Sequence, residues 1–142
     1  MPALSRALAV FDAINSGDFS VLDEAVTADF VDHGSPVPLP PGPEGYRQIL
    51  TVVHDVLQIR YTIEDAFETD ARVVIRAVAH GVGVDPIHGQ GAGGRAYSMP
   101  TVHIYRVEDD RLAEHWGVRD EFGARVQLGT VRAPTFPTPE TA

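Results

Sequence analysis

Apolar residues recur at helical spacing near the start of the chain and at alternating positions through much of the second half. One helical face is marked at the N-terminus by Leu4, Leu8, Phe11 and Ile14. Gly17 follows these residues as a stop signal. The pattern predicts further helices over residues 20–26 and from residue 42 to about residue 57, with a brief strand and an irregular proline-rich loop between them.

From Ile59 onward the period of the pattern changes to two, which is typical of strands with one buried face. Two antiparallel hairpins are predicted, one with its tip about residues 69–72 and the other with its tip about residues 108–111. A glycine-rich connection lies between them, and it lacks the preceding strand and following helix that a phosphate-binding loop requires.

A last short helix is expected over residues 121–128, and residues 130–142 have the composition of a disordered end. Helices followed by antiparallel strands indicate an α+β fold in a single domain over residues 1–129. Helices packed on one face of a curved sheet would enclose a cavity, where a ligand would bind.

Antiparallel pairing about Asp109 and Asp110 predicts which side chains of the second hairpin share a face. The expected cavity face carries Met99, Thr101, His103, Tyr105, Val107, Leu112, Glu114, Trp116, Val118 and Asp120. His115 and Arg119 fall on the other face, where we expect a dimer contact. A slip of one residue in the pairing would exchange the two faces.

The same construction on the first hairpin, with Asp70 and Ala71 at its tip, places Tyr61 opposite His80. Both side chains then join the expected cavity lining.

Composition excludes several classes of function. A net charge of −9 argues against nucleic acid and against an anionic membrane surface as partners. The chain has no cysteine, and all 11 of its basic residues are arginine, so thiol chemistry and Schiff-base chemistry are both excluded. No pair of histidines has metal-ligand spacing, no secretory signal is apparent and no apolar run is long enough to span a bilayer, so we expect a metal-free cytoplasmic protein.

Four segments together resemble the SnoaL-like polyketide cyclases of the nuclear transport factor 2-like superfamily, over about residues 3–129. They are "FDAINSGD", "DFVDHG", "GPEGYRQIL" and "RLAEHWGVRDEFGARVQLG". The resemblance implies a cone-shaped α+β barrel around a deep apolar pocket, and a homodimer formed through the sheet. It also implies that Asp120 is the acid/base of an aldol ring closure in antibiotic biosynthesis, without metal or organic cofactor. Asp32 and His33 match a pair at the pocket mouth, and His103 matches a polar pocket position.

On this basis we expect a cofactor-independent lyase or isomerase that closes a ring in a small hydrophobic polyketide-like substrate. Asp120 would move a proton at carbon, while His103 or His33 would stabilise the enolate oxygen. The expected substrate-binding residues are Trp116, Met99, Tyr105, Glu114, Tyr61, His80 and Asp32.

Alternatives remain for the key residues and for the function. Asp120 would also serve as the N-cap of the last helix, and His103 as a hydrogen-bonded core histidine. Glu114 and Tyr105 would also form a cross-strand polar pair. The rival functions are a pericyclic cyclase, a non-catalytic small-molecule binding protein, and an epoxide hydrolase that would need Arg119 inside the pocket.

Overall fold

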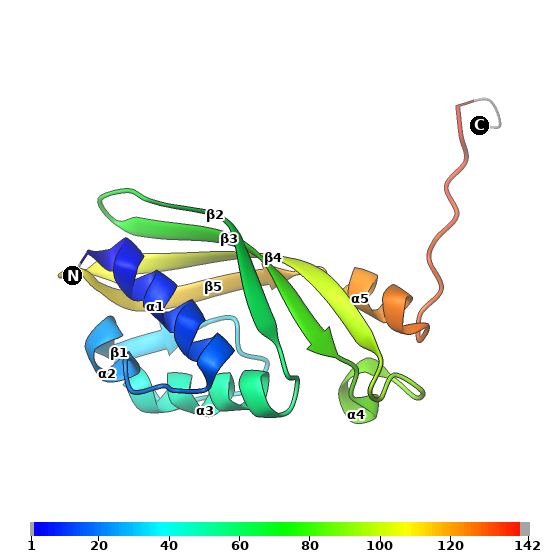
Figure 1. Ribbon diagram of the computed structural model, residues 1–142. Helices are drawn as coiled ribbons and strands as arrows, with labels where there is room; N and C mark the ends of the chain where they lie inside the picture. Colours follow the sequence, from blue (N-terminus) through cyan, green and yellow to red (C-terminus); the bar gives the residue numbers. More distant parts are fainter. Residues whose placement is uncertain (1, 140–142) are drawn as a thin grey trace.

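The computed structural model describes residues 2–139 and shows helices packed against one side of a curved five-stranded sheet (Figure 1). In chain order the elements are α1 (Ala3–Ser16), α2 (Leu22–Ala25), β1 (Val26–Asp32), α3 (Gly42–Asp55), β2 (Arg60–Glu68), β3 (Arg72–Val82), α4 (Asp85–His88), β4 (Ala96–Glu108), β5 (Arg111–Arg119) and α5 (Glu121–Leu128). The predicted α+β class is confirmed.

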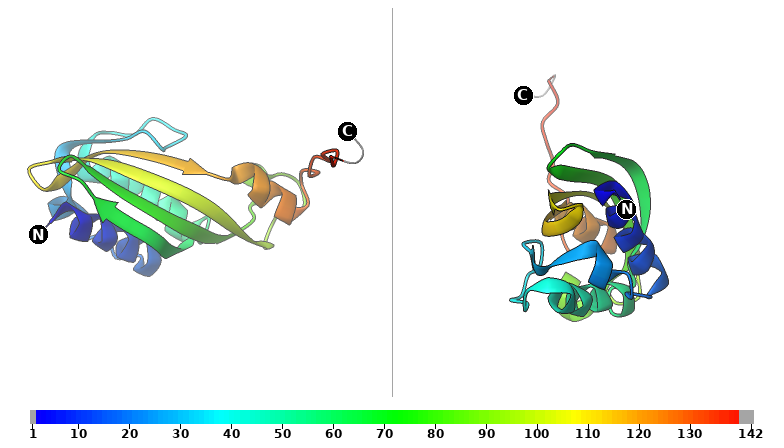
Figure 2. Two further views of the ribbon diagram at one scale, coloured as in Figure 1. Left: turned by 90° about the horizontal axis from the view of Figure 1, so that it is seen from above. Right: turned by 90° about the vertical axis from the view of Figure 1, so that its left-hand side faces the viewer.

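The strand order in the sheet is β1-β5-β4-β3-β2. β1 runs parallel to β5 at one edge, and every other neighbouring pair is antiparallel. The strands curve around α1, and α3 lies on the same side of the sheet (Figure 2). A sheet with helices on its concave side is the arrangement that the sequence pattern predicted.

The core lies between the concave face of the sheet and helices α1 and α3. α1 buries Val10, Phe11 and Ile14, and it ends at Gly17, whose left-handed φ of 83° lets its N–H bond to the carbonyl of Ala13. α3 follows a proline-rich segment and has a proline in its first turn, where the missing N–H costs nothing. The helix stop and start signals in the sequence therefore set the length of both covering helices.

The remaining helices match the sequence prediction unevenly. α5 has the predicted bounds, whereas the helix expected over residues 20–26 is only one turn long and passes directly into β1. The glycine-rich connection contains the short helix α4. No helix or strand occurs over residues 132–139, and residues 140–142 of the expected disordered tail lie outside the described residues. Within the described part of the chain, no helix has the length and hydrophobicity required to cross a membrane.

A β-bulge at Ala113 corrects the predicted register of the second hairpin. Asp109 and Asp110 form the tip with positive φ angles of 51° and 61°, and Val107 pairs with Leu112 as predicted. The next pair is Arg106 with Glu114, so Ala113 is an extra residue in β5. Leu112 and Ala113 are both buried in succession, and every later side chain of β5 lies on the opposite face from the one predicted.

Tyr105 therefore lies opposite His115, not opposite Glu114, and Trp116 lies opposite Ile104, not opposite His103. The predicted Tyr105–Glu114 polar pair is wrong for this reason. His115 is buried on the concave side of the sheet, while Trp116 and Val118 are exposed on the convex side.

A second irregularity, between Ile63 and Asp65, changes the pairing within the first hairpin. Asp65 pairs with Arg76 as predicted, but beyond the irregularity Tyr61 lies opposite Ala79. His80 is exposed, and its ring contacts the hydroxyl groups of Thr62 and Ser98 at 3.1 and 3.0 Å. The prediction that His80 lines the cavity is wrong, because β3 alternates without interruption and the side chains that it buries, from Val73 to Ala79, are those of the other face.

The hydroxyl groups of Tyr46 and Tyr105 share a hydrogen bond of 2.6 Å in the core, and both side chains are buried. We predict that Tyr105→Phe lowers the free energy of unfolding by about 1–3 kcal/mol, because it leaves the Tyr46 hydroxyl without a partner. The double variant Tyr46→Phe/Tyr105→Phe should lose much less than the sum of the single losses. Urea denaturation of the four proteins measures this cycle, and additive losses would contradict it.

Candidate active site

A cavity of about 240 Å³ lies between the sheet and the helices. Its walls are largely apolar and include Phe11, Ile14, Leu50, Val53, Ile59 and Met99. Chargeable side chains also line it, among them Asp32, His103, His115 and Arg119. The cavity exceeds the ~150 Å³ site that holds one benzene ring, so it has room for a compact substrate of one or two rings. Apolar walls with a few converging polar groups are typical of a small-molecule site.

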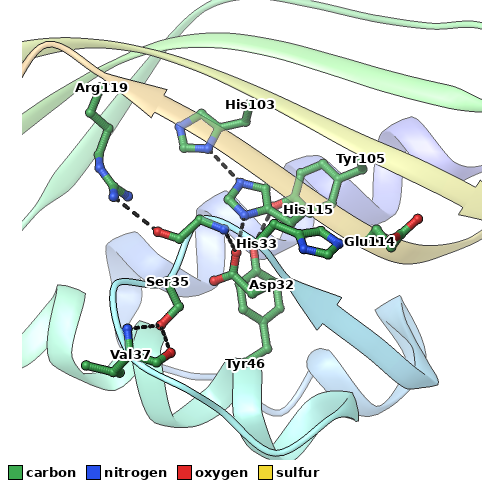
Figure 3. A network of polar contacts seen from close by, with 11 residues as sticks. Asp32, His33, Ser35, Val37, Tyr46, His103, Tyr105, Glu114, His115 and Arg119 are labelled. Atoms are coloured by element: carbon green, nitrogen blue, oxygen red, sulfur yellow. Dashed lines mark hydrogen bonds and ion pairs between the residues drawn. The ribbon is translucent and has the colours of Figure 1, made fainter.

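The polar groups form a continuous hydrogen-bonded chain across the concave face (Figure 3). His103 Nδ1 lies 2.9 Å from His115 Nε2, and His115 Nδ1 lies 2.6 Å from Asp32 Oδ1. The side chains of Asp32 and His115 are only 6% and 7% exposed. The chain therefore connects the end of β1 to the centre of β4 in an environment that is nearly free of bulk water.

Two glycines make room for this chain. Gly117 pairs with His103 across the sheet, and a Cβ on Gly117 would lie 3.1 Å from the His115 ring. A Cβ on Gly34 would lie 3.2 Å from Asp32 Oδ1 and 3.3 Å from the His115 ring. Because these distances are shorter than ordinary carbon contacts, a larger residue at either position would displace the imidazole. The Gly34 N–H also donates to Asp32 Oδ1 at 2.8 Å.

Burial keeps two polar side chains of the site, His103 and Tyr61, uncharged. Desolvation lowers the pKa of His103 well below its usual value, and the nearby charges of His115 and Arg119 lower it further. Desolvation also raises the pKa of Tyr61 to about 12. Tyr61 is therefore a neutral phenol at neutral pH, and its hydroxyl remains available as a hydrogen-bond donor.

Arg119 supplies a positive charge at one side of the cavity. Its Nη2 donates to the carbonyl of Gly34 at 3.2 Å, and its Nε lies 3.4 Å from a carboxylate oxygen of Glu121. Both Arg119 and Glu121 line the cavity. The predicted outward orientation of His115 and Arg119 is wrong, because the bulge at Ala113 turns both side chains inward.

Five of the predicted site residues line the cavity: His103, Met99, Tyr105, Tyr61 and Asp32. The other five do not, and the altered strand phase accounts for most of them. Trp116 and Glu114 follow the bulge and lie on the convex side of the sheet. His33 stacks on Trp116 with a centroid distance of 5.2 Å, and its Nε2 lies 2.9 Å from Glu114 Oε1. His33 is therefore part of a surface cluster, outside the cavity.

Asp120 has the structural role that the sequence offered as an alternative. It is exposed, it is the N-cap of α5, and its carboxylate accepts a hydrogen bond of 2.9 Å from the N–H of Gly123. The prediction that Asp120 is buried beside Met99, Trp116 and Val118 is wrong. Asp32 is instead the carboxylate that faces the dry interior.

The sequence prediction missed His115 and Arg119 as cavity residues. Two signals could have located them. Leu112 and Ala113 are consecutive apolar residues that interrupt the alternation of β5, and Gly117 stands where an inward-facing side chain would otherwise be expected.

Comparisons with known proteins show the family of the chain. The SnoaL-like polyketide cyclase family matches residues 5–128. The chain belongs to this family. No curated protein sequence matches the chain.

Several solved structures have the same fold. TsrD from Streptomyces laurentii is 28% identical, with a TM-score of 0.75 over 89% of this chain and 94% of TsrD. IdmH from Streptomyces antibioticus, a proposed polyketide cyclase, is also 28% identical, with a TM-score of 0.75 over 91% of this chain and 99% of IdmH. A SnoaL-like polyketide cyclase from Agrobacterium tumefaciens is 22% identical, with a TM-score of 0.76 over 91% of this chain and 99% of that protein, a likeness that concerns the fold alone.

We predict that Asp120→Ala lowers the free energy of unfolding by about 1 kcal/mol, because alanine cannot cap α5. Asp120→Asn should be close to the unsubstituted protein, since asparagine caps a helix about as well as aspartate. Thermal or urea denaturation measures both variants. Equal losses in the two variants would show that the charge of Asp120, not its capping bond, stabilises this end of the sheet.

Proposed function

We propose that the protein is a polyketide cyclase that closes a ring by aldol chemistry, with Asp32 as the general base. The observation that carries this proposal is the placement of Asp32. Both of its hydrogen bonds fall on Oδ1, from Gly34 N and His115 Nδ1, and Oδ2 has no hydrogen-bond partner among residues 2–139. Asp32 lines the largely apolar cavity, and a carboxylate oxygen without a protein partner on such a residue is suited to accept a proton from a carbon acid.

In the proposed reaction, Asp32 Oδ2 removes a proton from a carbon next to a carbonyl group of the substrate. The electron pair of the broken C–H bond forms an enolate, whose carbon then attacks a second carbonyl carbon in the same chain. The new C–C bond closes the ring and leaves an alkoxide. The protonated carboxyl of Asp32 returns the proton to this alkoxide, so no other reagent is consumed.

Negative charge develops on substrate oxygen in both steps, and donors that are already in place stabilise it. Arg119 offers a guanidinium group from β5, and Tyr61 offers a neutral hydroxyl from β2. In a water-excluded cavity, loss of one such donor reduces the rate of this kind of step by about 10²–10³-fold. This assigns to Arg119 and Tyr61 the oxyanion-stabilising role that the sequence prediction gave to His103 or His33.

A second candidate function is epoxide hydrolysis, in which Asp32 and Arg119 would orient a water molecule. The inward position of Arg119 favours it, because this reaction requires a cation beside a carboxylate in the cavity. Aldol closure is preferred because the bonds from His115 and Gly34 to Oδ1 hold Asp32 in place as a base beside largely apolar walls. Such walls suit a carbon acid better than the water molecule that an epoxide opening requires.

The predicted homodimer through the sheet remains a proposal. The convex face of the sheet exposes adjacent apolar side chains, among them Ile104, Trp116 and Val118. Exposed apolar groups on neighbouring strands are typical of an interface between copies of a chain. Sedimentation equilibrium of the purified protein measures the oligomeric state, and a monomer at all concentrations would exclude the dimer.

We predict that the protein accelerates deuterium exchange at the methyl group of 2-acetylnaphthalene, a two-ring aromatic ketone, in D₂O. This probe reports proton removal beside a carbonyl without requiring the natural substrate, and NMR measures the loss of the methyl proton signal. Asp32→Asn should reduce the enzymatic rate by about 10²–10⁴-fold, the usual contribution of a general base.

The matched control is Asp120→Asn, which removes an exposed carboxylate outside the cavity and should retain the full exchange rate. Circular dichroism and urea denaturation check that both variants fold. Loss of exchange in Asp120→Asn with retention in Asp32→Asn would overturn the assignment of the base.

Styrene oxide tests the second candidate function. We predict that the protein does not accelerate diol formation above the rate in buffer, because the proposed site supplies a base for a carbon acid and not an activated water molecule. Chromatography measures the diol. Rapid diol formation that is lost in both Asp32→Asn and Arg119→Gln would favour the hydrolase over the cyclase.

A further inference from the structure

The chain of hydrogen bonds in the active site extends one residue beyond His103. His103 Nε2 lies 2.9 Å from Thr101 Oγ1, and Thr101 Oγ1 lies 2.9 Å from the carbonyl oxygen of Ala77 on β3. Thr101 is 2% exposed and His103 is 4% exposed, so water cannot substitute for either contact. Four hydrogen bonds therefore connect Ala77, Thr101, His103, His115 and Asp32 in series.

The Ala77 carbonyl fixes the direction of the chain at its first bond. A carbonyl oxygen can only accept, so the Thr101 hydroxyl must donate to it. A hydroxyl has one hydrogen, and this hydrogen is already committed to Ala77. Thr101 Oγ1 must therefore accept its other bond, and the donor is the Nε2–H of His103.

The direction at His103 then determines the direction at His115. Burial lowers the pKa of His103 well below its usual value, so its ring carries one proton, and that proton is on Nε2. His103 Nδ1 is left as an acceptor. The 2.9 Å contact between the two rings is a hydrogen bond only if His115 Nε2 carries a proton and donates it.

The last bond of the chain requires one more proton. His115 Nδ1 lies 2.6 Å from Asp32 Oδ1, which also accepts the N–H of Gly34. With His115 Nε2 already protonated, a neutral His115 and an ionised Asp32 would leave two acceptors facing each other at this contact. One proton must therefore lie between Nδ1 and Oδ1. Imidazole is a stronger base than a carboxylate, and Oδ1 already accepts the N–H of Gly34, so the proton belongs on Nδ1 and Asp32 is a carboxylate that accepts from two N–H groups.

We propose that Thr101 is a positioning residue that fixes the direction of this chain and thereby makes His115 an imidazolium paired with ionised Asp32. The same two histidines without Thr101 need no additional proton. His103 could then donate from Nδ1 to His115 Nε2, and a neutral His115 could donate from Nδ1 to Asp32. The hydroxyl of Thr101 therefore determines whether the site stores one extra proton.

The surroundings of the two rings are compatible with a paired charge. The titratable and charged groups that face them are Tyr46 on α3, Tyr61 on β2, Tyr105 on β4, Arg119 on β5 and Asp32 at the end of β1. Burial raises the pKa of all three tyrosines, so they are neutral. Asp32 is thus the only anion among these groups, and its 2.6 Å contact offsets the cost of a buried imidazolium.

The catalytic consequence of this state rests on the proposed function. An adjacent imidazolium keeps Asp32 ionised, and therefore able to accept a proton at Oδ2 each time a substrate enters. After proton removal from carbon, Asp32 carries the substrate proton beside the imidazolium of His115, and the alkoxide takes back the proton on Asp32. The proton on His115 remains in place through the cycle.

NMR of protein labelled with ¹⁵N in its histidines tests the proposal at neutral pH without any substrate. We expect both nitrogens of His115 to give signals of the protonated type, and His103 to give a protonated Nε2 and an unprotonated Nδ1. Substitution of His103 or His115 by glutamine, one at a time, assigns the signals. A singly protonated His115 in the unsubstituted protein would overturn the proposal.

Thr101→Val tests the role of the hydroxyl with a side chain of nearly the same shape. We expect His115 to lose the protonated signal of Nε2 and His103 to change to the Nδ1–H tautomer, whereas Thr101→Ser should restore the original pattern. A purely structural role for Thr101 would leave the protonation of both rings unchanged in the valine variant, and that result would also overturn the proposal.

The spectrum and the exchange reaction separate the two proposals. An imidazolium at His115 in a protein that does not exchange the protons of 2-acetylnaphthalene would support the role of Thr101 and contradict the proposed function. The unsubstituted protein alone decides the protonation of His115, so the proposal remains testable even if Thr101→Val does not fold.

Discussion

The candidate active site depends on one extra residue in β5. Ala113 has no counterpart on β4, and its insertion reverses the direction in which every later side chain of the strand points. Without the bulge, Glu114 and Trp116 would face the cavity, and His115 and Arg119 would face solvent. A bulge leaves one residue without a partner on the neighbouring strand. Here that local loss brings an imidazole and a guanidinium group into an apolar cavity.

Once His115 faces inward, the remaining geometry follows from the need to satisfy buried polar groups. An imidazole that is nine-tenths removed from water requires partners at both nitrogens, and the structure supplies His103 on one side and Asp32 on the other. Asp32 reaches this position because β1 pairs in parallel with β5, with Asp32 directly opposite His115. Gly34 and Gly117 leave the space that the ring occupies. The need to pair both nitrogens of His115 thus brings together residues that are far apart in the sequence.

The sequence was sufficient for the fold and for about half of the site. Helical spacing, the stop signal at Gly17 and the change to period two predicted the α+β class, and the resemblance to the cyclases predicted the barrel. The cavity residues of β4, such as Met99 and His103, were placed correctly because β4 alternates without interruption. β5 was placed incorrectly after Ala113, since strict alternation from the tip assumes that no residue is inserted. A bulge is only weakly visible in the sequence, as two adjacent apolar residues. Its position is determined by side-chain packing across the sheet, which the pattern of residues in one strand does not contain.

Asp32 and Asp120 show how position determines what the same side chain can do. Asp120 lies at the first turn of a helix, in contact with water, where its carboxylate satisfies a backbone N–H and complements the helix dipole. Asp32 lies at the end of the edge strand β1 and lines the cavity. Two N–H groups donate to its Oδ1, and its Oδ2 has no hydrogen-bond partner among residues 2–139. Water around Asp120 would compete for any substrate proton and would screen the charge that develops on oxygen. Around Asp32 this competition is absent, because apolar side chains form the cavity walls, so ring-forming proton transfer is better suited to the carboxylate at the end of β1.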